Sequence, residues 1–241
     1  MIEAAKRILT KRAAAAGRLL ARPAVVTQAG APKGLQQLKL GERDVGLLYV
    51  PAGYSADRPA PLALMLHGAG GIARHGISWL QPFADEAGLI LLATDSHQGT
   101  WDVIVKEYGP DVALIDHVLE QTFDRYNVEP SQIAVGGFSD GASYALSLGL
   151  TNGDLFTHVI AFSPGFIASA EQRGRPRLFI SHGKLDQVLP INVCSRRIVP
   201  QVERAGHDVR YREFDGPHTV PPEIAREAVE WFVGERSSES Q

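Results

Sequence analysis

The sequence predicts a single α/β domain in which helices cover both faces of a mostly parallel β-sheet. Short apolar runs of strand length alternate along the chain with segments of helical periodicity, which is the pattern of repeated β-α-β units. Several runs end directly in glycine, serine or aspartate, as strands do where their carboxyl ends form the functional edge of a sheet. The 241 residues, 44% of them hydrophobic, suffice for one domain with a full core.

The expected strands and helices are read from these runs and periodicities. Residues 111–126 place Val112, Ile115 and Leu119 on one helical face. Two prolines open the last helix, where the fixed φ of proline suits the first turn. Strands are predicted at residues 45–50, 62–66, 89–94, 133–136, 159–162, 177–181 and 209–214, and helices at residues 111–126, 142–150, 191–205 and 221–233.

The two ends of the chain are predicted to lie outside this domain. Residues 1–34 form a basic N-terminal arm and a linker rich in alanine, glycine and proline, and residues 236–241 form a disordered tail. Arg18 and Arg22 interrupt the alanine-rich stretch of the arm, which therefore makes a poor apolar core for a signal peptide. We expect a partly helical, solvated arm and a folded domain over residues 35–235.

Composition and charge exclude several classes of partner. The formal net charge of −3 offers no basic field for nucleic acid, and no apolar run approaches the roughly 20 residues that span a bilayer. The single cysteine, Cys194, cannot form an intramolecular disulfide, which fits a reducing compartment. We expect a cytoplasmic protein without stable membrane insertion. No H-E-x-x-H, G-x-G-x-x-G or P-loop pattern occurs, so neither a metal nor a nucleotide cofactor is expected.

A tight strand-to-helix turn is predicted around Ser139, the centre of a G-x-S-x-G motif at residues 137–141. A buried strand precedes this serine and a helix follows it, and the glycines avoid a clash at such a turn. We therefore predict Ser139 as a nucleophile. A near-copy of the motif surrounds Ser163, but the next residue, Pro164, has no N–H to offer an oxyanion. Asp140 keeps that N–H, so Ser163 is interpreted as structural.

A glycine-rich loop at residues 67–71 follows an earlier strand and is expected to supply a second donor for an oxyanion. Its glycines let backbone N–H groups approach a ligand without obstruction by side chains. We predict the N–H groups of Ala69 and Asp140 as the oxyanion hole, with Gly70 as the next choice and as a substrate contact. His67 is interpreted as the residue that pins this loop.

The base and its orienting acid are predicted at the same edge of the sheet. Asp186 follows one strand and His218 follows the last, in the chain order serine, acid, histidine. His218 can take the proton of Ser139, while Asp186 holds its tautomer and stabilises the imidazolium. Asp208 precedes its strand and belongs to the opposite edge. His182 adjoins the site and is interpreted as a hydrogen-bonding wall.

Together these motifs resemble the capless carboxylesterase/phospholipase group of α/β-hydrolases, and the chain is particularly similar to polyhydroxybutyrate-depolymerase-like and feruloyl-esterase-like proteins. The resemblance runs from about residue 41 to residue 232 and rests on residues 66–71, 137–143, 181–186 and 216–219. It implies the α/β-hydrolase fold without a lid domain, and ester hydrolysis through an acyl-serine intermediate without a cofactor. Secreted depolymerases carry a signal peptide and paired cysteines, so extracellular polymer is not the expected substrate.

The substrate is expected to be a small-molecule or lipid-like ester. Only residues 165–175 separate two consecutive predicted strands, which is too short for a lid domain and predicts an open, shallow site. Trp101, Leu189 and Val220 are candidate lining residues, each with core packing as the alternative. A thioesterase, phospholipase or acyltransferase would use the same triad. A non-catalytic binding protein is the alternative of another class, and the complete set of triad and oxyanion residues argues against it.

Overall fold

The computed structural model describes residues 2–24, 26, 31–168 and 171–234, with side chains from residue 8 onward. Its centre is one eight-stranded sheet in the order β1-β2-β4-β3-β5-β6-β7-β8. Only β1 and β2 run antiparallel to their neighbours, which confirms the predicted mostly parallel sheet. The strands are β1 (Gly34–Leu40), β2 (Arg43–Val50), β3 (Ala60–Leu66), β4 (Ile90–Thr94), β5 (Val128–Phe138), β6 (His158–Phe162), β7 (Arg177–Gly183) and β8 (Val209–Phe214).

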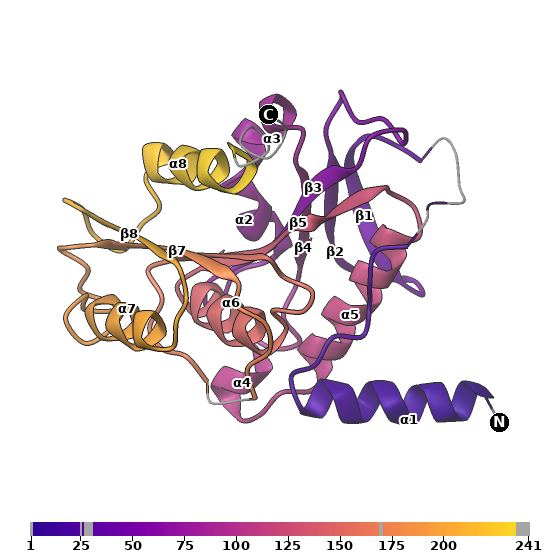
Figure 1. Cartoon of the computed structure of the whole chain (residues 1–241). Coiled ribbons are helices and arrows are strands. Elements are labelled where there is room, and N and C mark those ends of the chain that lie inside the picture. Colours follow the sequence, from indigo (N-terminus) through magenta and orange to yellow (C-terminus); the bar gives the residue numbers. More distant parts are fainter. Residues whose placement is uncertain (1, 25, 27–30, 169–170, 235–241) are drawn as a thin grey trace.

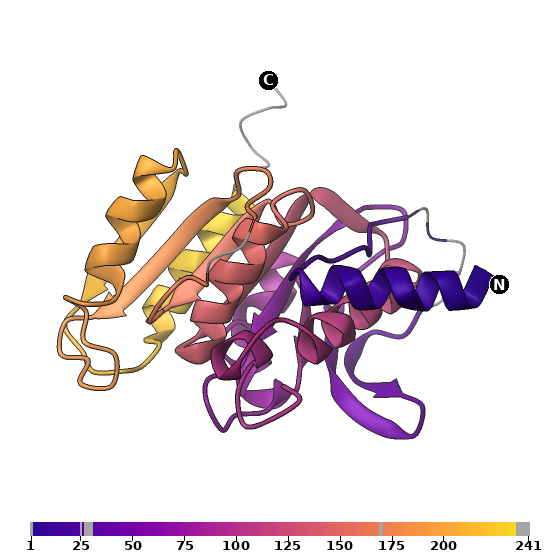
Figure 2. The same cartoon turned by 90° about the horizontal axis from the view of Figure 1, so that it is seen from below.

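Helices cover both faces of the sheet. Figure 1 shows α2, α3 and α8 above the sheet and α5, α6 and α7 below it, and Figure 2 shows the lower three side by side. The helices are α1 (Ile2–Ala15), α2 (Ala73–Ser78), α3 (Gln81–Ala87), α4 (Asp102–Val105), α5 (Pro110–Phe123), α6 (Asp140–Thr151), α7 (Ser195–Arg204) and α8 (Pro222–Val233). Among the described residues, no helix is both long and apolar enough to cross a membrane.

Each face of the sheet has its own hydrophobic core. Alternate residues of the fully buried strand β3 show this division, because Leu62 and Leu64 pack toward α5 and α6 while Ala63 and Met65 pack toward α2 and α8. A strand buried on both faces must be apolar at every position. This is why the central strands were recognisable as continuous apolar runs in the sequence.

The structure differs from the predicted elements where the pattern was weak or ambiguous. The edge strand β1 was missed because Leu38 is its only buried residue and polar side chains surround it. Helices α2, α3 and α4 have 6, 7 and 4 residues, too few for a helical periodicity to stand out. Residues 191–194 form a turn before α7 rather than its first turn, although Ile191 and Cys194 are buried at helical spacing.

The prediction of a solvated N-terminal arm is wrong for the segment that follows α1. Leu19 is completely buried in the core, and its N–H donates to Asn152 Oδ1 at 2.9 Å. Asp116 Oδ1 accepts the N–H groups of Leu20 and Ala21 at 2.6 and 2.8 Å. The folded unit therefore includes this segment, and the predicted boundary at residue 35 falls inside β1. Part of the predicted linker, residues 27–30, and the predicted tail lie outside the described residues.

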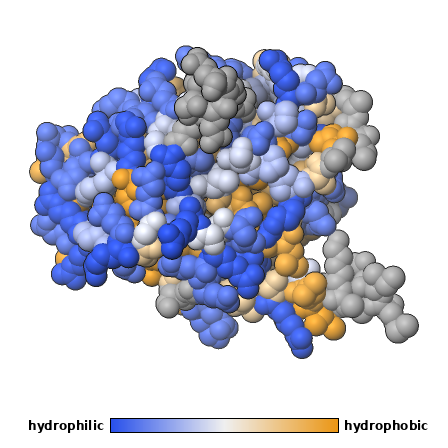
Figure 3. Space-filling view, in the orientation of Figure 1, coloured by the Kyte–Doolittle hydropathy of each residue, from blue (hydrophilic) through white to orange (hydrophobic). Residues whose placement is uncertain are grey.

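Helix α1 itself extends away from the body, past the end of α5 (Figures 1 and 2). Its last turn is attached through Ala14, which joins the main core, whereas Ile8 and Leu9 are exposed. Figure 3 shows hydrophobic surface at the lower right of the molecule, where Figure 1 places α1. A wide hollow between α1, α4 and α5 contains none of the residues predicted for the triad.

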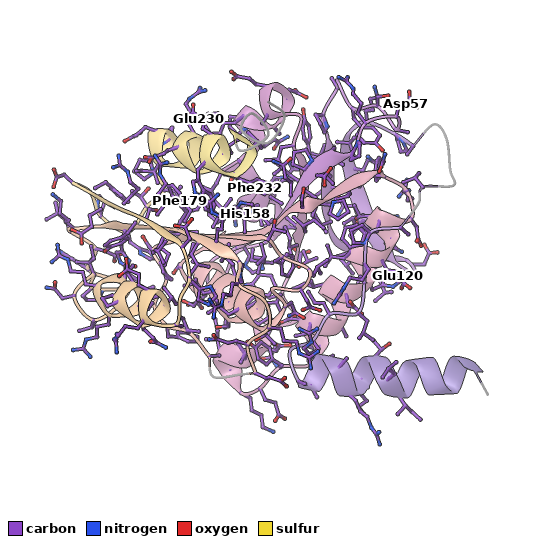
Figure 4. All side chains as sticks on the ribbon, viewed as in Figure 1. Asp57, Glu120, His158, Phe179, Glu230 and Phe232 are labelled. Atoms are coloured by element: carbon purple, nitrogen blue, oxygen red, sulfur yellow. The ribbon has the colours of Figure 1, made fainter. Side chains whose placement is uncertain are left out.

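The buried histidine of β6 should make stability depend on acid pH. His158 packs edge-on against Trp231 and Phe232 of α8 at centroid distances of 5.0 Å, and Figure 4 shows it beside Phe232 and Phe179. Burial, followed by the charge of Arg177, lowers the pKa of His158 to about 4. Unfolding returns it to near 6.5, so its full contribution is present above pH 6.5 and is lost as pH falls toward 4.

Replacing His158 with leucine should therefore flatten the acid side of the stability curve. Urea denaturation at pH 7.5 and pH 5 measures this, and between these values the wild type should lose about 2 kcal/mol of unfolding free energy that the variant does not lose. His97→Gln, at an exposed position, is the matched control and should keep the wild-type slope. Equal pH slopes for wild type and His158→Leu would contradict the assignment.

Candidate active site

A strained turn places Ser139 between β5 and α6. Its φ of 58° is one of two positive values at non-glycine positions among the described residues. The turn is held by a hydrogen bond from the Ser139 N–H to Phe162 O at 2.9 Å. A Cβ on Gly137 would lie 2.5 Å from the backbone of Gly141, and a Cβ on Gly141 would lie 2.2 Å from Leu66 O. The two glycines of the motif are thus required by close packing of backbone around the serine.

Ser139, His218 and Asp186 form one continuous line of hydrogen bonds. His218 Nε2 lies 2.9 Å from Ser139 Oγ, and His218 Nδ1 lies 2.5 Å from Asp186 Oδ2. A carboxylate accepts, so Nδ1 carries the proton and Nε2 is left to accept the Ser139 hydroxyl. The His218 ring also packs on Phe138, with ring centroids 4.5 Å apart. The structure therefore brings together the three residues predicted from distant parts of the chain.

The environment of Asp186 keeps its carboxylate ionised. Burial raises the pKa of Asp186, but the hydrogen bond from His218 and those from the backbone N–H groups of Leu189 and Val188 outweigh it, and the net pKa lies below its ordinary value. The two N–H groups donate to Oδ1 at 2.8 and 2.9 Å. Because Oδ1 is occupied in this way, Oδ2 is left facing His218 in a fixed orientation.

His182 is a structural neighbour of the acid, as its position in the sequence predicted. Its side chain is completely buried, and burial lowers its pKa, so the ring is neutral near pH 7. Nε2 donates to Leu189 O at 2.7 Å and lies 3.2 Å from Asp186 Oδ2, and Nδ1 accepts from Ser195 Oγ at 2.7 Å. These contacts hold the Asp186 loop against α7.

The glycine-rich loop after β3 passes directly beside the serine. A Cβ on Gly68 would lie 3.4 Å from Ser139 Cβ. His67 is buried and donates from Nδ1 to Gly68 O at 2.8 Å, which confirms its predicted role of pinning the loop. The Gly70 N–H donates to Gly99 O at 2.6 Å, so Gly70 does not supply the second oxyanion donor. Its surface stays exposed at the site.

Ala69 and Asp140 remain the two predicted oxyanion donors. Ala69 lies on the exposed part of the loop, next to Gly68. Asp140 is the first residue of α6, and the first N–H groups of a helix have no acceptor within that helix. The same position gives this N–H the favourable field of a helix N-terminus toward negative charge. Both amides therefore belong to segments that adjoin Ser139.

The prediction that Trp101 lines the substrate site is wrong, and its alternative, core packing, describes what is found. Trp101 is 0% exposed and stacks on Tyr144 of α6, with ring centroids 5.1 Å apart and an interplanar angle of 14°. Its Nε1 donates to His67 O at 2.9 Å. Leu189 and Val220 are half-buried. Leu189 lies next to Gly165, and Val220 packs against the core that includes α8.

Three exposed apolar residues in the loops after β6 and β7 were not predicted. Leu185 and Val188 lie in the loop of Asp186 and are 66% and 67% exposed, and Phe166, after β6, is 37% exposed. The signal available in the sequence was an apolar side chain before and after Asp186, in a loop that follows a strand. Ser163, in contrast, is buried, and its N–H donates to Ser181 O at 2.7 Å, in keeping with a structural role. In the part of the chain that the structure describes, no cluster of three or more His, Cys, Asp or Glu side chains could hold a metal ion.

The chain is similar in sequence to one protein family and to several named esterases. The sequence model of the phospholipase/carboxylesterase family matches residues 102–229. The chain is 28% identical over 162 residues to "Probable feruloyl esterase C" of Aspergillus flavus, covering 64% of this chain and 58% of that protein. It is 32% identical over 111 residues to "Acetylxylan esterase" of Coprinopsis cinerea, covering 42% of this chain and 29% of that protein. The chain thus spans little more than half the length of the feruloyl esterase C relative.

Solved structures share the fold. "Esterase PE8" superposes with a TM-score of 0.63 at 22% identity, over 77% of this chain and 96% of that chain. The ferulic acid esterase AmCE1/Fae1A of Anaeromyces mucronatus gives a TM-score of 0.63 at 18% identity, over 87% of this chain and 92% of that chain. The family match covers more than half of the sequence and includes Ser139, Asp186 and His218. The chain therefore belongs to the phospholipase/carboxylesterase family and has the α/β-hydrolase fold.

Proposed function

We propose that this protein is a serine hydrolase that cleaves carboxylic esters by two-step acyl transfer to water. The observation that carries the proposal is the unbroken hydrogen-bonded line from Asp186 through His218 to Ser139. Family membership and the esterase names of its relatives support the reaction class. Nucleophile, base and orienting acid stand in the order that acyl transfer requires.

In the first step, Ser139 Oγ attacks the ester carbonyl while His218 Nε2 takes its proton and then delivers that proton to the leaving alcohol. The N–H groups of Ala69 and Asp140 bind the negative oxygen of the tetrahedral intermediate. In the second step, His218 takes a proton from water, whose oxygen attacks the acyl-serine carbonyl. His218 then returns this proton to Ser139 Oγ as the acyl–oxygen bond breaks and the acid leaves. Asp186 stays ionised throughout and stabilises the imidazolium.

The site is proposed to be open and to accept short acyl groups or the exposed end of a bulky ester. Fourteen residues, 163–176, separate β6 from β7, and their described part holds no helix that could serve as a lid. Leu185, Val188 and Phe166 are exposed in the loops that follow the parallel strands β6 and β7, at the edge that carries Asp186, and are the proposed apolar surround. The names of the relatives point to esters of an aryl acid or of acetic acid on a larger alcohol, which suits such a site.

The decisive experiment combines active-site labelling with a panel of substrates. A fluorophosphonate probe should label the wild type and the control variant Ser163→Ala, and should not label Ser139→Ala. Among p-nitrophenyl esters, acetate and butyrate should give higher kcat/KM than laurate, and methyl ferulate should be hydrolysed. A wild type that resists the probe and turns over none of these esters overturns the proposal. Faster turnover of a thioester or a phospholipid would assign the same triad to one of the alternative activities.

A further inference from the structure

The loop of residues 95–101, which follows β4, holds the glycine-rich loop that carries Ala69. Its Ser96 N–H donates to His67 Nε2 at 3.1 Å, and its Trp101 Nε1 donates to His67 O at 2.9 Å. Its Gly99 O accepts the Gly70 N–H at 2.6 Å. Three hydrogen bonds on both sides of Ala69 thus fix the peptide planes that neighbour the first proposed oxyanion donor.

The same loop also holds the first turn of α6. Thr100 Oγ1 donates to Asp140 Oδ2 at 2.6 Å. Trp101 stacks on Tyr144, one turn further along α6. Gly99 and Thr100 are adjacent residues, so one short piece of backbone joins the residue after Ala69 to the side chain of Asp140. The loop of residues 95–101 therefore holds the segments of both proposed oxyanion donors.

This loop is itself rigidly anchored at its end. Asp102 N–H donates to Asp111 Oδ2 at 2.7 Å and Asp111 N–H donates to Asp102 Oδ2 at 2.9 Å, which forms a reciprocal pair of bonds. Asp111 Oδ1 accepts the His97 N–H at 2.6 Å, and Tyr144 OH donates to Asp102 Oδ1 at 2.9 Å. A loop tied at these points places the hydroxyl of Thr100 with little freedom.

We propose that Thr100 is a positioning residue for ester hydrolysis, acting through Asp140 on the oxyanion hole; this rests on the proposed function. An aspartate immediately after the nucleophile brings a negative carboxylate close to the place where a negative oxygen forms. Thr100 holds that carboxylate against the 95–101 loop through a short, charge-assisted O–H···O⁻ bond. The bond also fixes the first residue of α6, whose N–H must be aligned before reaction because preorganised donors give the largest stabilisation.

The test is a conservative series at position 100. Thr100→Val keeps the shape and removes the hydroxyl, and should lower kcat about 10-fold to 100-fold, as expected for a hydrogen bond to a charged group. KM should stay within about twofold, because the bond acts on the developing oxyanion rather than on the bound ester. Affinity for a trifluoromethyl ketone, which forms a tetrahedral adduct with the serine, should fall by a similar factor. Thr100→Ser should restore most of the activity.

A double-mutant cycle with Asp140→Asn identifies the charge as the cause. The asparagine has no negative charge to restrain, so Thr100→Val should cost clearly less in that background than in the wild type. Thermal unfolding by circular dichroism checks that each variant is folded, and Thr100→Ala replaces the valine variant if valine disrupts the loop.

Unchanged kcat and inhibitor affinity in a folded Thr100→Val or Thr100→Ala variant overturn the positioning role. A serine variant as impaired as valine, or a loss confined to KM, does the same. Failure of the proposed function is distinguishable, because the wild type itself would then resist the fluorophosphonate and hydrolyse no ester.

Discussion

Ser139→Ala and His218→Ala are each expected to lower kcat for ester hydrolysis by about 10⁴-fold to 10⁶-fold, and the double variant is expected to be no worse than either one. The hydrogen bond of 2.9 Å between Ser139 Oγ and His218 Nε2 makes the two side chains one functional unit. Without the hydroxyl there is nothing for the imidazole to deprotonate, and without the imidazole the hydroxyl is a weak nucleophile at neutral pH.

Initial rates with saturating p-nitrophenyl acetate measure these losses. Each variant is first purified by chromatography to remove contaminating esterase. The rate acceleration that remains, relative to the uncatalysed reaction in water, should come from the Ala69 and Asp140 donors and from substrate binding. Ser163→Ala provides the matched control, because Ser163 has the same backbone φ region and a buried side chain, but its Oγ has no hydrogen-bond partner among the described residues. Losses that simply multiply in the double variant would show that the two residues act independently, against the proposed mechanism.

The residues that meet at the candidate site could be selected from the sequence because their constraints are local or depend only on strand order. A nucleophilic serine in a G-x-S-x-G motif stands on a turn between a strand and a helix, and this context is visible in the sequence around Ser139. Residues that follow parallel strands meet at one edge of the sheet. Those two rules were enough to select Ser139, Asp186 and His218 from sequence. The distances between them came only from the folded chain, since they depend on how β5, β7 and β8 pair.

The residues that were misjudged depend on partners far away in the chain. An aromatic residue in a loop at this edge of the sheet can face either ligand or core, and Trp101 faces the core because its ring packs against Tyr144 and His67. The segment after α1 has two adjacent leucines among alanines and arginines, with no periodicity that marks either leucine as buried. Leu19 is held in the core by a bond to the side chain of Asn152, which is 133 residues away in the chain. The bond from Thr100 to Asp140 gives no signal in either local sequence.

Gly141→Ala is expected to lower the free energy of unfolding strongly, although alanine favours a helix by about 1 kcal/mol over glycine at an ordinary position. Gly141 lies in the first turn of α6, where an added Cβ would be 2.2 Å from Leu66 O and 2.5 Å from His67 O. Both atoms belong to backbone at the end of β3, so no side-chain rotation can relieve the clash. Overpacking of this kind costs about 1–3 kcal/mol or more, a large fraction of the 5–15 kcal/mol that typically stabilises a domain.

Two further glycine variants separate this clash from the effect of helix propensity. Gly149 lies in the same helix, but the nearest atom to its added Cβ is Val159 Cγ2, at 2.5 Å, a side-chain atom that can move, so Gly149→Ala should lose less stability. Gly53 has nothing within 4 Å of an added Cβ, and Gly53→Ala should stay close to wild type. Urea denaturation should therefore rank the variants Gly53→Ala, Gly149→Ala, Gly141→Ala in falling stability. A Gly141→Ala protein as stable as wild type would mean that β3 and α6 do not approach as closely as described, and the strained turn that presents Ser139 would lose its explanation.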